Sequence, residues 1–320
     1  MLKFKQQIND VVPIFYACDD NFVKFTIVSI NSLMVNASKN RKYHIYVLYA
    51  TMSEDMQKRL KELENDVFSI SLVCVEKELE KIGKKLPLRD YYSKTTYYRF
   101  FIAELFPQCN KAIYIDSDTV VLGDISKVYD EDISDCYVGA CHEQAMVQND
   151  VFGTYVENVL GIDRNNYFNA GFLLVNCKKF REKRVFEQFI ELLGVYDFVV
   201  TQDQDYLNVI CQNNVKWLNQ GWNTEVFGVI PVEEKNIKII HYIMVSKPWH
   251  YFDCRLKDYF WDYAINTSVY DLIFEELYFY TDEQKQKDLA SAVRLEKLAK
   301  EETEKEDNYY NLISRRRKDA

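Results

Sequence analysis

The sequence lacks the features that define several classes of protein. No stretch is long and apolar enough to cross a membrane, and Met1–Gln6 contain no apolar signal region. It has neither a Gly-x-Gly-x-x-Gly motif nor a Walker loop, so the usual binding loops for dinucleotides and ATP are missing. None of its eight cysteines forms a C-x-x-C pair, which argues against a zinc site.

The composition also lacks a basic excess. Forty Lys and Arg residues stand against 49 Asp and Glu, giving a net charge of −9 that argues against nucleic acid as the main partner. Most cysteines lie in apolar runs, as Cys74 does between Val73 and Val75, which is typical of buried thiols in a reduced compartment. We therefore expect a cytoplasmic protein whose 320 residues can bury a sizeable core.

The most informative local pattern is the apolar run Ala112–Ile115, which is followed directly by Asp116, Ser117 and Asp118. Such a run is typical of a buried strand in a parallel sheet, and ligands of open α/β sheets bind beyond the carboxyl ends of these strands. Whether the strand continues or a turn follows, both carboxylates project from one short segment. Two such oxygen donors suit Mg²⁺ or Mn²⁺ with a phosphorylated ligand, although an acidic turn without a metal has the same pattern.

Alternating strand and helix patterns predict an α/β fold with a mostly parallel, doubly wound sheet. Strands are expected at Val11–Ala17, His44–Tyr49, Phe68–Val75, Tyr137–Cys141, Phe172–Cys177 and Ile237–Tyr242. Helices are expected after the first two strands, the second capped by Ser53, and at Thr95–Phe106, Lys178–Leu193 and Asp203–Cys211. We expect a surface loop at Glu76–Asp90 and a long substrate-side loop or lid at Glu143–Tyr167.

The composition changes near Thr281, where a charged helix that reaches Asp307 is predicted to begin with this threonine as its cap. Its expected apolar stripe consists of Leu289, Val293, Leu295 and Leu298. The segment Tyr309–Lys318 then combines aromatic and aliphatic residues with a basic cluster. It is either a frayed, solvated tail or a peripheral anchor that contacts anionic lipid on the inner face of the membrane.

Four further polar motifs lie beside apolar runs, which is where α/β enzymes usually carry their catalytic and ligand-binding residues. They are Asp19-Asp20-Asn21, Tyr167–Gly171, Thr201–Asp205, and His241-Tyr242 with Lys247–His250 behind it. Together with Asp116–Asp118, in this order and spacing, they resemble glycosyltransferase family 8, which includes glycogenin and bacterial lipooligosaccharide galactosyl- and glucosyltransferases. The resemblance runs from about Pro13 to Trp249.

The resemblance implies a GT-A fold, a metal-dependent UDP-hexose donor, and sugar transfer with retention of anomeric configuration. A glycan, glycolipid or lipooligosaccharide-type acceptor is implied. The expected organisation is a GT-A domain over residues 1–262 and a C-terminal helical extension with a basic tail over residues 263–320.

The implied metal ligands are Asp116 and Asp118, as a D-x-D motif, together with His241. Two carboxylates and one imidazole, with diphosphate oxygens completing an octahedron, favour Mn²⁺, with Mg²⁺ as the alternative. Without a metal, His241 would be a strand-end histidine bonded to backbone.

The other implied donor contacts come from several motifs. Asp19 and Asn21, with backbone from Ala17 and Cys18, match the uridine site, although Asp-Asp-Asn is also a good helix-capping loop. Lys247 matches the lysine that neutralises the diphosphate. The remaining matched positions are Arg99, for which a surface ion pair is the less favoured alternative, Ser117 beside the ribose, and Glu143, Asn169, Ala170 and Gly171 around the donor sugar.

Asp203 and Gln204 match the catalytic pair of the family. An amide is a poor nucleophile, so we expect same-face attack, with Gln204 stabilising an oxocarbenium-like transition state. The alternatives are a covalent glycosyl-enzyme on Asp203, or a polar helix start with no chemical role.

One residue departs from the family pattern. Members usually carry glycine three residues after the motif histidine, and this chain has Met244 there. Either the loop Ile243–Ser246 follows another path, or its phosphate contact is weaker.

The preferred interpretation is therefore a retaining, Mn²⁺-dependent hexosyltransferase. A sugar-phosphate nucleotidyltransferase also uses paired acids and metal, but the sequence shows neither a third carboxylate for a second metal nor a basic triphosphate cradle. A non-catalytic nucleotide-sugar-binding relative is disfavoured because Asp116, Asp118, His241, Gln204 and Lys247 are all present.

Overall fold

The computed structural model describes residues 11–82, 86–87 and 94–318. Its centre is a seven-stranded sheet of order β3-β2-β1-β4-β7-β6-β8, in which only β7 runs antiparallel to its neighbours. The strands are β1 (Val11–Ala17), β2 (Lys42–Tyr49), β3 (Phe68–Cys74), β4 (Ala112–Ile115), β6 (Val138–His142), β7 (Phe168–Val175) and β8 (Val215–Trp217). The predicted α/β class and mostly parallel sheet are confirmed.

Both faces of this sheet are covered, which explains the uninterrupted apolar runs. Alternate residues of β4 enter different cores: Ile113 and Ile115 pack on one face, Ala112 and Tyr114 on the other. One face is covered by α1 (Val23–Asn36), α2 (Glu54–Lys61) and α5 (Ile125–Tyr129). The other face holds the 3₁₀ segment η1 (Lys94–Phe101), α4 (Ile102–Leu105), α8 (Cys177–Glu182), α9 (Val185–Leu193) and α10 (Asp203–Cys211).

A second sheet brings a late segment of the chain to the central strands. It has the order β5-β10-β9, with β5 at Thr119–Val121, β10 at Ile239–His241 and β9 at Thr224–Glu225. Because β10 pairs antiparallel with β5 and places His241 opposite Thr119, the histidine lies beside the acids that precede β5.

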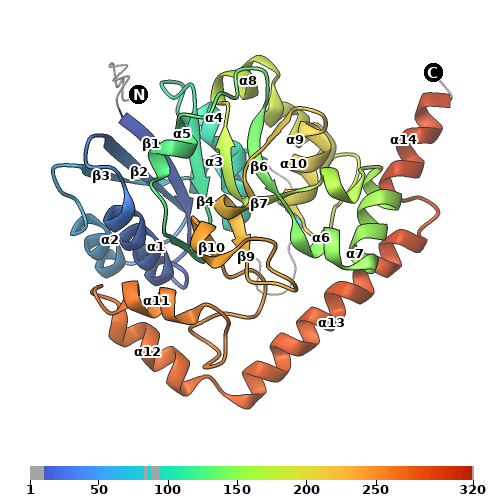
Figure 1. Cartoon of the computed structure of the whole chain (residues 1–320). Helices are drawn as coiled ribbons and strands as arrows, with labels where there is room; N and C mark the ends of the chain where they lie inside the picture. Colours follow the sequence, from blue (N-terminus) through green and yellow to red (C-terminus); the bar gives the residue numbers. More distant parts are fainter. Residues whose placement is uncertain (1–10, 83–85, 88–93, 319–320) are drawn as a thin grey trace.

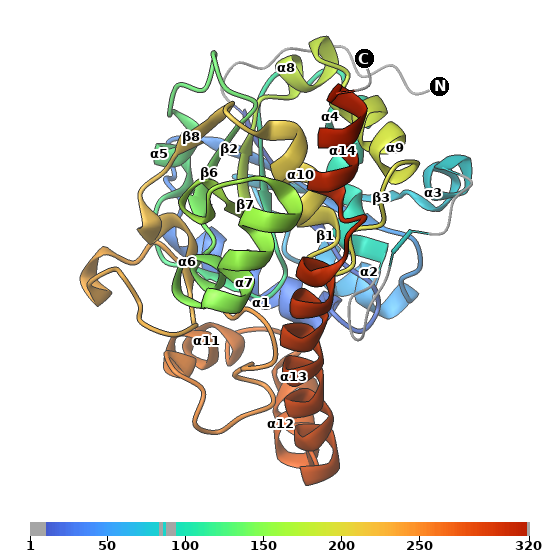
Figure 2. The ribbon, with the colours of Figure 1, turned by 90° about the vertical axis from the view of Figure 1, so that its right-hand side faces the viewer.

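The C-terminal helices run along the lower edge of the molecule in Figure 1 and then up its right side. They are α11 (Lys257–Ala264), α12 (Tyr270–Phe279), α13 (Asp282–Glu304) and α14 (Tyr309–Lys318). Figure 2 shows α13 as a long helix that runs from α12 up to the side of α7 (Asp150–Tyr155). No helix in the described part of the chain combines the length and the apolar character that crossing a bilayer requires.

Several local predictions were wrong. Glu143–Tyr167 is not a loop: Glu143 and Asn149 cap α6 (Gln144–Gln148) and α7, and the π-helical η2 (Val156–Leu160) and the 3₁₀ turn η3 (Arg164–Asn166) follow. Their turns are too short to show a helical period.

Other boundaries differ. The expected loop after Val75 begins with α3 (Glu76–Ile82); residues 83–85 and 88–90 of that prediction lie outside the described residues. The expected helix Lys178–Leu193 is two helices, because Arg184 adopts a left-handed φ of 54° between them. The basic tail forms α14 rather than a frayed end.

Candidate active site

The acidic motif lies in the short link between β4 and β5, so of the two paths left open by the sequence the strand ends and a turn follows. Its backbone is fixed where the Asp116 N–H donates to Gly171 O at 2.7 Å. Ser117 Oγ accepts from Thr26 Oγ1 at 2.7 Å and donates to Ala17 O at 3.3 Å. These bonds hold the link against α1 and β1, and its two carboxylates project into a cleft.

Three oxygen and nitrogen donors converge at this link. Ligand atoms of Asp116, Asp118 and His241 all lie within 4.8 Å of one another. His241 Nε2 is 3.2 Å from Asp118 Oδ1 and 4.0 Å from Asp116 Oδ2. Two carboxylates and one imidazole form a donor set that suits Mn²⁺ or Mg²⁺.

Asn223 fixes how His241 presents its ring. Asn169 Oδ1 accepts from Gly171 N, so Asn223 Nδ2 must be the donor in its 2.8 Å bond to the same oxygen. The Oδ1 of Asn223 therefore faces His241 Nδ1 at 3.0 Å and accepts its proton. The lone pair of the neutral ring is then on Nε2, toward the two acids, which is the arrangement that a metal ligand requires.

Lys247 neutralises the acidic side of the cluster. Its Nζ donates to Asp118 Oδ2 at 2.6 Å and to Tyr242 O, and the side chain is only 8% exposed. Burial alone would raise the pKa of Asp118, but the positive charge of Lys247, together with that of His241 in its protonated form, outweighs burial and lowers this pKa below its usual value. Asp118 is therefore ionised, as metal ligation requires.

Arg99 links the acidic motif to Asp203. Its guanidinium lies 3.1 Å from Asp116 Oδ1 and 3.1 Å from Asp203 Oδ2, stacks over the Tyr114 ring at 4.4 Å, and donates to Ala170 O. With 4% of its side chain exposed, it is not a surface ion pair. Burial raises the pKa of Asp203 to about 7, and Arg99 opposes this shift.

A second hydrogen-bond network surrounds Gln204 at the start of α10. Its Oε1 accepts from Ala170 N at 2.8 Å, and its Nε2 donates to Glu143 Oε2 at 3.0 Å. Asn169 Nδ2 donates to the same Glu143 oxygen at 2.7 Å. Since Asn169 also bonds Asn223, and Asn223 bonds His241, one chain of hydrogen bonds joins Gln204 to the candidate metal site.

Gly171 permits the close approach of the His241 ring to Asp116. A Cβ at this position would lie 2.3 Å from His241 Cε1 and 2.7 Å from Asp116 Oδ2. Any side chain would push the imidazole away from the acids, so glycine is needed here for steric reasons.

These groups share one cavity of about 180 Å³. The predicted residues in its lining are Ala17, Arg99, Asp116, Ser117, Asp118, Glu143, Asn169, Gly171, Asp203, Gln204, His241 and Lys247. Ala170 contributes backbone atoms only, to Gln204 and Arg99.

The other three predicted donor-site residues do not line this cavity. Cys18 is buried, Asn21 is exposed, and Asp19 Oδ1 accepts from Asn21 N and Phe22 N in the turn that precedes α1. One of the two Asp19 oxygens is therefore used within a loop, whereas the N-cap residue of α1 is Phe22 and has no side-chain cap.

The sequence did not reveal Asn223 or Glu225. Glu225 is fully buried and accepts from Gln144 N at 3.0 Å, and burial, together with the neighbouring Glu143, raises its pKa well above the usual value. The available signal was the polar run Asn223-Thr224-Glu225 in front of the apolar pair Val226-Phe227, but nothing in the sequence placed it in the interior.

The fold and the site together define a GT-A glycosyltransferase. The chain belongs to glycosyl transferase family 8, whose sequence model matches residues 13–253. It is 29% identical over 255 residues to a putative glycosyltransferase of Haemophilus influenzae, covering 76% of this chain and 74% of that protein. It is 28% identical over 254 residues to the lipopolysaccharide 1,3-galactosyltransferase of Salmonella typhimurium, covering 75% and 74%.

Solved structures show the same fold. Galactosyltransferase LgtC in complex with donor and acceptor sugar analogs matches with a TM-score of 0.66 and 26% identity, over 80% of this chain and 96% of that one. The apo structure of the bifunctional glycosyltransferase WbbM matches with a TM-score of 0.72 and 25% identity over 85% of this chain, which spans about half (53%) of the WbbM chain.

Proposed function

We propose that this glycosyltransferase moves glucose or galactose from UDP to a glycan, glycolipid or lipooligosaccharide-type acceptor with the help of a divalent cation. The observation that carries the proposal is the convergence of Asp116, Asp118 and His241 within 4.8 Å, in the same cavity as Asp203 and Gln204. A nucleotide sugar needs both sets of residues. Asp116, Asp118 and His241 would hold its diphosphate through the cation, and Asp203 and Gln204 would face its reacting carbon.

Asp116, Asp118 and His241 would hold the cation, Mn²⁺ or Mg²⁺. The chemistry that it supplies there is neutralisation of the diphosphate charge. The fit is supported by the ring orientation that Asn223 imposes and by the ionised state of Asp118. Lys247, already beside Asp118, would give a second positive charge to the leaving phosphate.

The uridine would lie at the ends of β1 and β4. Ser117 and Ala17 line the cavity there, and Asp19, Asn21 and the backbone of Cys18 follow in the chain. The donor sugar would lie against Asn169, Gly171 and Glu143, with the Arg99–Asp203 pair beneath it.

The proposed reaction retains the anomeric configuration through same-face attack. The acceptor hydroxyl oxygen bonds to the anomeric carbon as the bond from that carbon to the diphosphate oxygen breaks, and the hydroxyl proton passes to the departing diphosphate. Gln204, held by Ala170 N and Glu143, would stabilise the positive charge that develops on the sugar.

A covalent intermediate on Asp203 is less well supported. The side chain of Asp203 is 4% exposed, its carboxyl group is paired with Arg99 at 3.1 Å, and its pKa is raised to about 7. A nucleophile needs an ionised and accessible oxygen, so Asp203 is better suited to orient the donor sugar and Arg99.

We retain two wider expectations within this proposal. Residues 1–262 would form the transferase domain and residues 263–320 the extension, with the division falling inside α11. The protein would act in the cytoplasm, and the exposed Arg315 and Arg316 of α14 would contact anionic lipid.

The test is UDP release from UDP-glucose and UDP-galactose in the presence of Mn²⁺ or EDTA. Release with Mn²⁺ and loss with EDTA are expected. Pyrophosphate formation from UTP and a sugar phosphate would instead show the nucleotidyltransferase alternative.

A further inference from the structure

One wall of the active-site cavity is apolar and has no part in the donor contacts described above. It is formed by Met146 of α6, Phe152 of α7, Leu295 of α13, and Met244 in the loop after β10. The first two and Leu295 belong to one continuous apolar cluster, and Met244 packs against the same cluster. We refer to these four residues as the apolar wall.

The apolar wall begins where the sugar contacts end. Glu143, which holds Gln204 and Asn169, is the N-cap of α6, and Ala145 and Met146 of that helix line the cavity directly after it. The cavity is therefore polar around the donor-sugar residues and becomes apolar along α6, α7 and α13. A ligand that extends past the donor sugar meets this wall.

Met244 occupies its place at a conformational penalty. Its φ is 57°, in the left-handed region that favours glycine, and glycine is the residue that the sequence pattern leads us to expect there. The loop has therefore kept a glycine-type backbone while carrying a long side chain that lines the cavity. Strain retained at a ligand cavity indicates that the side chain itself has a role.

Leu295 comes from outside the segment that the family shares, which ends at residue 253. Helix α13 is positioned at both ends of its cavity-facing stretch. Asp288 accepts from Tyr251 and Tyr280 at 2.8 Å each, and Glu302 accepts from Tyr196 at 2.6 Å. Between these bonds Leu295 is 6% exposed, whereas Leu289 and Val293 on the same helix are 57% and 68% exposed.

Resting on the proposed transferase function, we infer that the apolar wall binds the aglycone of the acceptor, and that this aglycone is an alkyl chain or an aromatic ring. Two methionines suit such a ligand because their flexible, polarisable side chains adapt to irregular apolar shapes. The acceptor class is then a glycoside with an apolar aglycone, with its sugar hydroxyl at Gln204 and its aglycone against Met244 and Leu295.

The test compares matched acceptors below their micelle concentration: methyl, n-hexyl and phenyl β-glycosides of glucose, galactose, N-acetylglucosamine and lactose. For each sugar, the ratio of kcat/KM for the hexyl or phenyl glycoside to that for the methyl glycoside measures aglycone recognition. Calorimetric affinity with UDP present gives the same ratio for glycosides that bind without reacting. A ratio of about 10 is expected, equivalent to burial of one or two methylene groups.

Leu295→Ser should reduce this ratio below about 3, whereas Leu289→Ser, the same change on the exposed side of α13, should leave it unchanged. Met244→Gly should also reduce the ratio, and it relieves the left-handed strain, so a folding defect is not expected to obscure the result. A ratio taken within one variant is independent of general losses in donor binding or folding.

A ratio near 1 for every sugar, or a full ratio in both Leu295→Ser and Met244→Gly, would overturn the inference while leaving the transferase proposal intact. Absence of UDP release from any UDP-sugar would instead overturn the proposed function. The two failures are therefore distinguishable.

Discussion

At the residue scale, the site depends on how His241 is oriented as much as on which residues are present. The Asn223 oxygen accepts the Nδ1 proton and leaves Nε2 to face Asp116 and Asp118. Such outer contacts fix the tautomer and the position of a metal-ligating ring.

Asn223→Ala should weaken Mn²⁺ binding about 10- to 100-fold, because the imidazole loses its fixed tautomer and orientation. Calorimetric titration of the protein with Mn²⁺ measures this directly. Asn236→Ala is the matched control, since Asn236 is exposed on the turn before β10. Equal Mn²⁺ affinity in the two variants would show that Asn223 does not support the metal site.

Gln204→Ala should keep donor binding and slow sugar transfer by about 10²- to 10³-fold, the usual loss when one preorganised group at a transition state is removed. UDP-sugar affinity and single-turnover rates separate the two effects. Gln212→Ala, just after the same helix, is the control. An unchanged single-turnover rate in Gln204→Ala would exclude the amide from the chemistry.

At the scale of elements, helix α12 is held to the body of the protein by a charged contact. Glu276 receives a hydrogen bond from His250 Nε2 at 3.0 Å and pairs with Lys24 of α1. Burial alone would raise the pKa of Glu276, but these two partners outweigh it and the net pKa is lowered from 4.5. A lowered pKa stabilises the fold above the unfolded-state value, and this stabilisation is lost as the pH falls through and below about 4.5.

Glu276→Gln should therefore lower the free energy of unfolding near neutral pH by about 1–2 kcal/mol, and the difference from the parent should shrink as the pH falls below about 4. Urea titrations across pH measure both quantities. The neighbouring Glu275→Gln, on the exposed side of α12, should change neither. A difference that grows on acidification would contradict the assigned sign.

Elements that carry a continuous apolar run or a helical period were predictable, and the short helical turns were not. The runs at β1 and β4 and helix α10 match their predicted bounds, and Thr281 forms the expected cap with a capping box to Gln284. The stripe of α13 was wrong in part: Leu295 is buried, but Leu289 and Val293 are exposed. Which face of a solvated helix packs inward depends on its partners, α7 and η2, rather than on its own period.

The candidate site was recoverable from the sequence where its residues end apolar runs, as Asp116, Asp118 and His241 do. Asn223 and Glu225 were missed, because their burial results from the pairing of β9 with β10, a contact that no local pattern contains. Met244 shows the opposite case: the sequence indicated a departure, and the structure shows that the left-handed backbone was kept.

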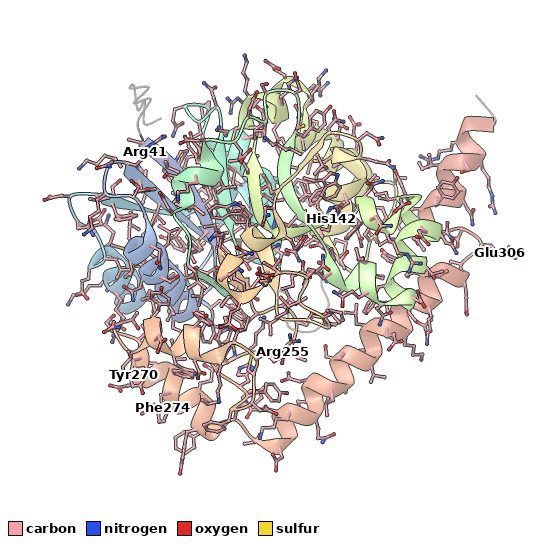
Figure 3. All side chains as sticks on the ribbon, viewed as in Figure 1. Arg41, His142, Arg255, Tyr270, Phe274 and Glu306 are labelled. Atoms are coloured by element: carbon pink, nitrogen blue, oxygen red, sulfur yellow. The ribbon has the colours of Figure 1, made fainter. Side chains whose placement is uncertain are left out.

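At the scale of the whole molecule, the exposed aromatic residues of α12 and the basic residues of α14 lie at opposite ends of the C-terminal helices. Figure 3 shows Tyr270 and Phe274 on α12 at one end and Glu306, between α13 and α14, at the other. Tyr309 of the tail packs on Phe198 with ring centroids 5.1 Å apart. Its ring therefore packs against the protein, and lipid contact by the tail would depend on Arg315, Arg316 and the half-exposed Tyr310.

The Arg315→Glu, Arg316→Glu double variant should reduce sedimentation with anionic phosphatidylglycerol vesicles by about tenfold or more, since each basic residue near such a surface contributes about 1 kcal/mol. Lys297→Glu with Lys300→Glu, on exposed positions of α13, makes the same change in net charge elsewhere. Equal vesicle binding by the two double variants would rule out a specific anchor in α14.

The most direct test of the central claim is UDP release from UDP-glucose or UDP-galactose by the parent protein and by Asp118→Ala, each assayed with Mn²⁺ and with EDTA. We expect Mn²⁺-dependent release by the parent and a loss of at least about 10²-fold in Asp118→Ala, with an unchanged circular dichroism spectrum. Parent-level release by Asp118→Ala, or release that EDTA does not affect, would contradict the assignment of Asp116, Asp118 and His241 as the metal site.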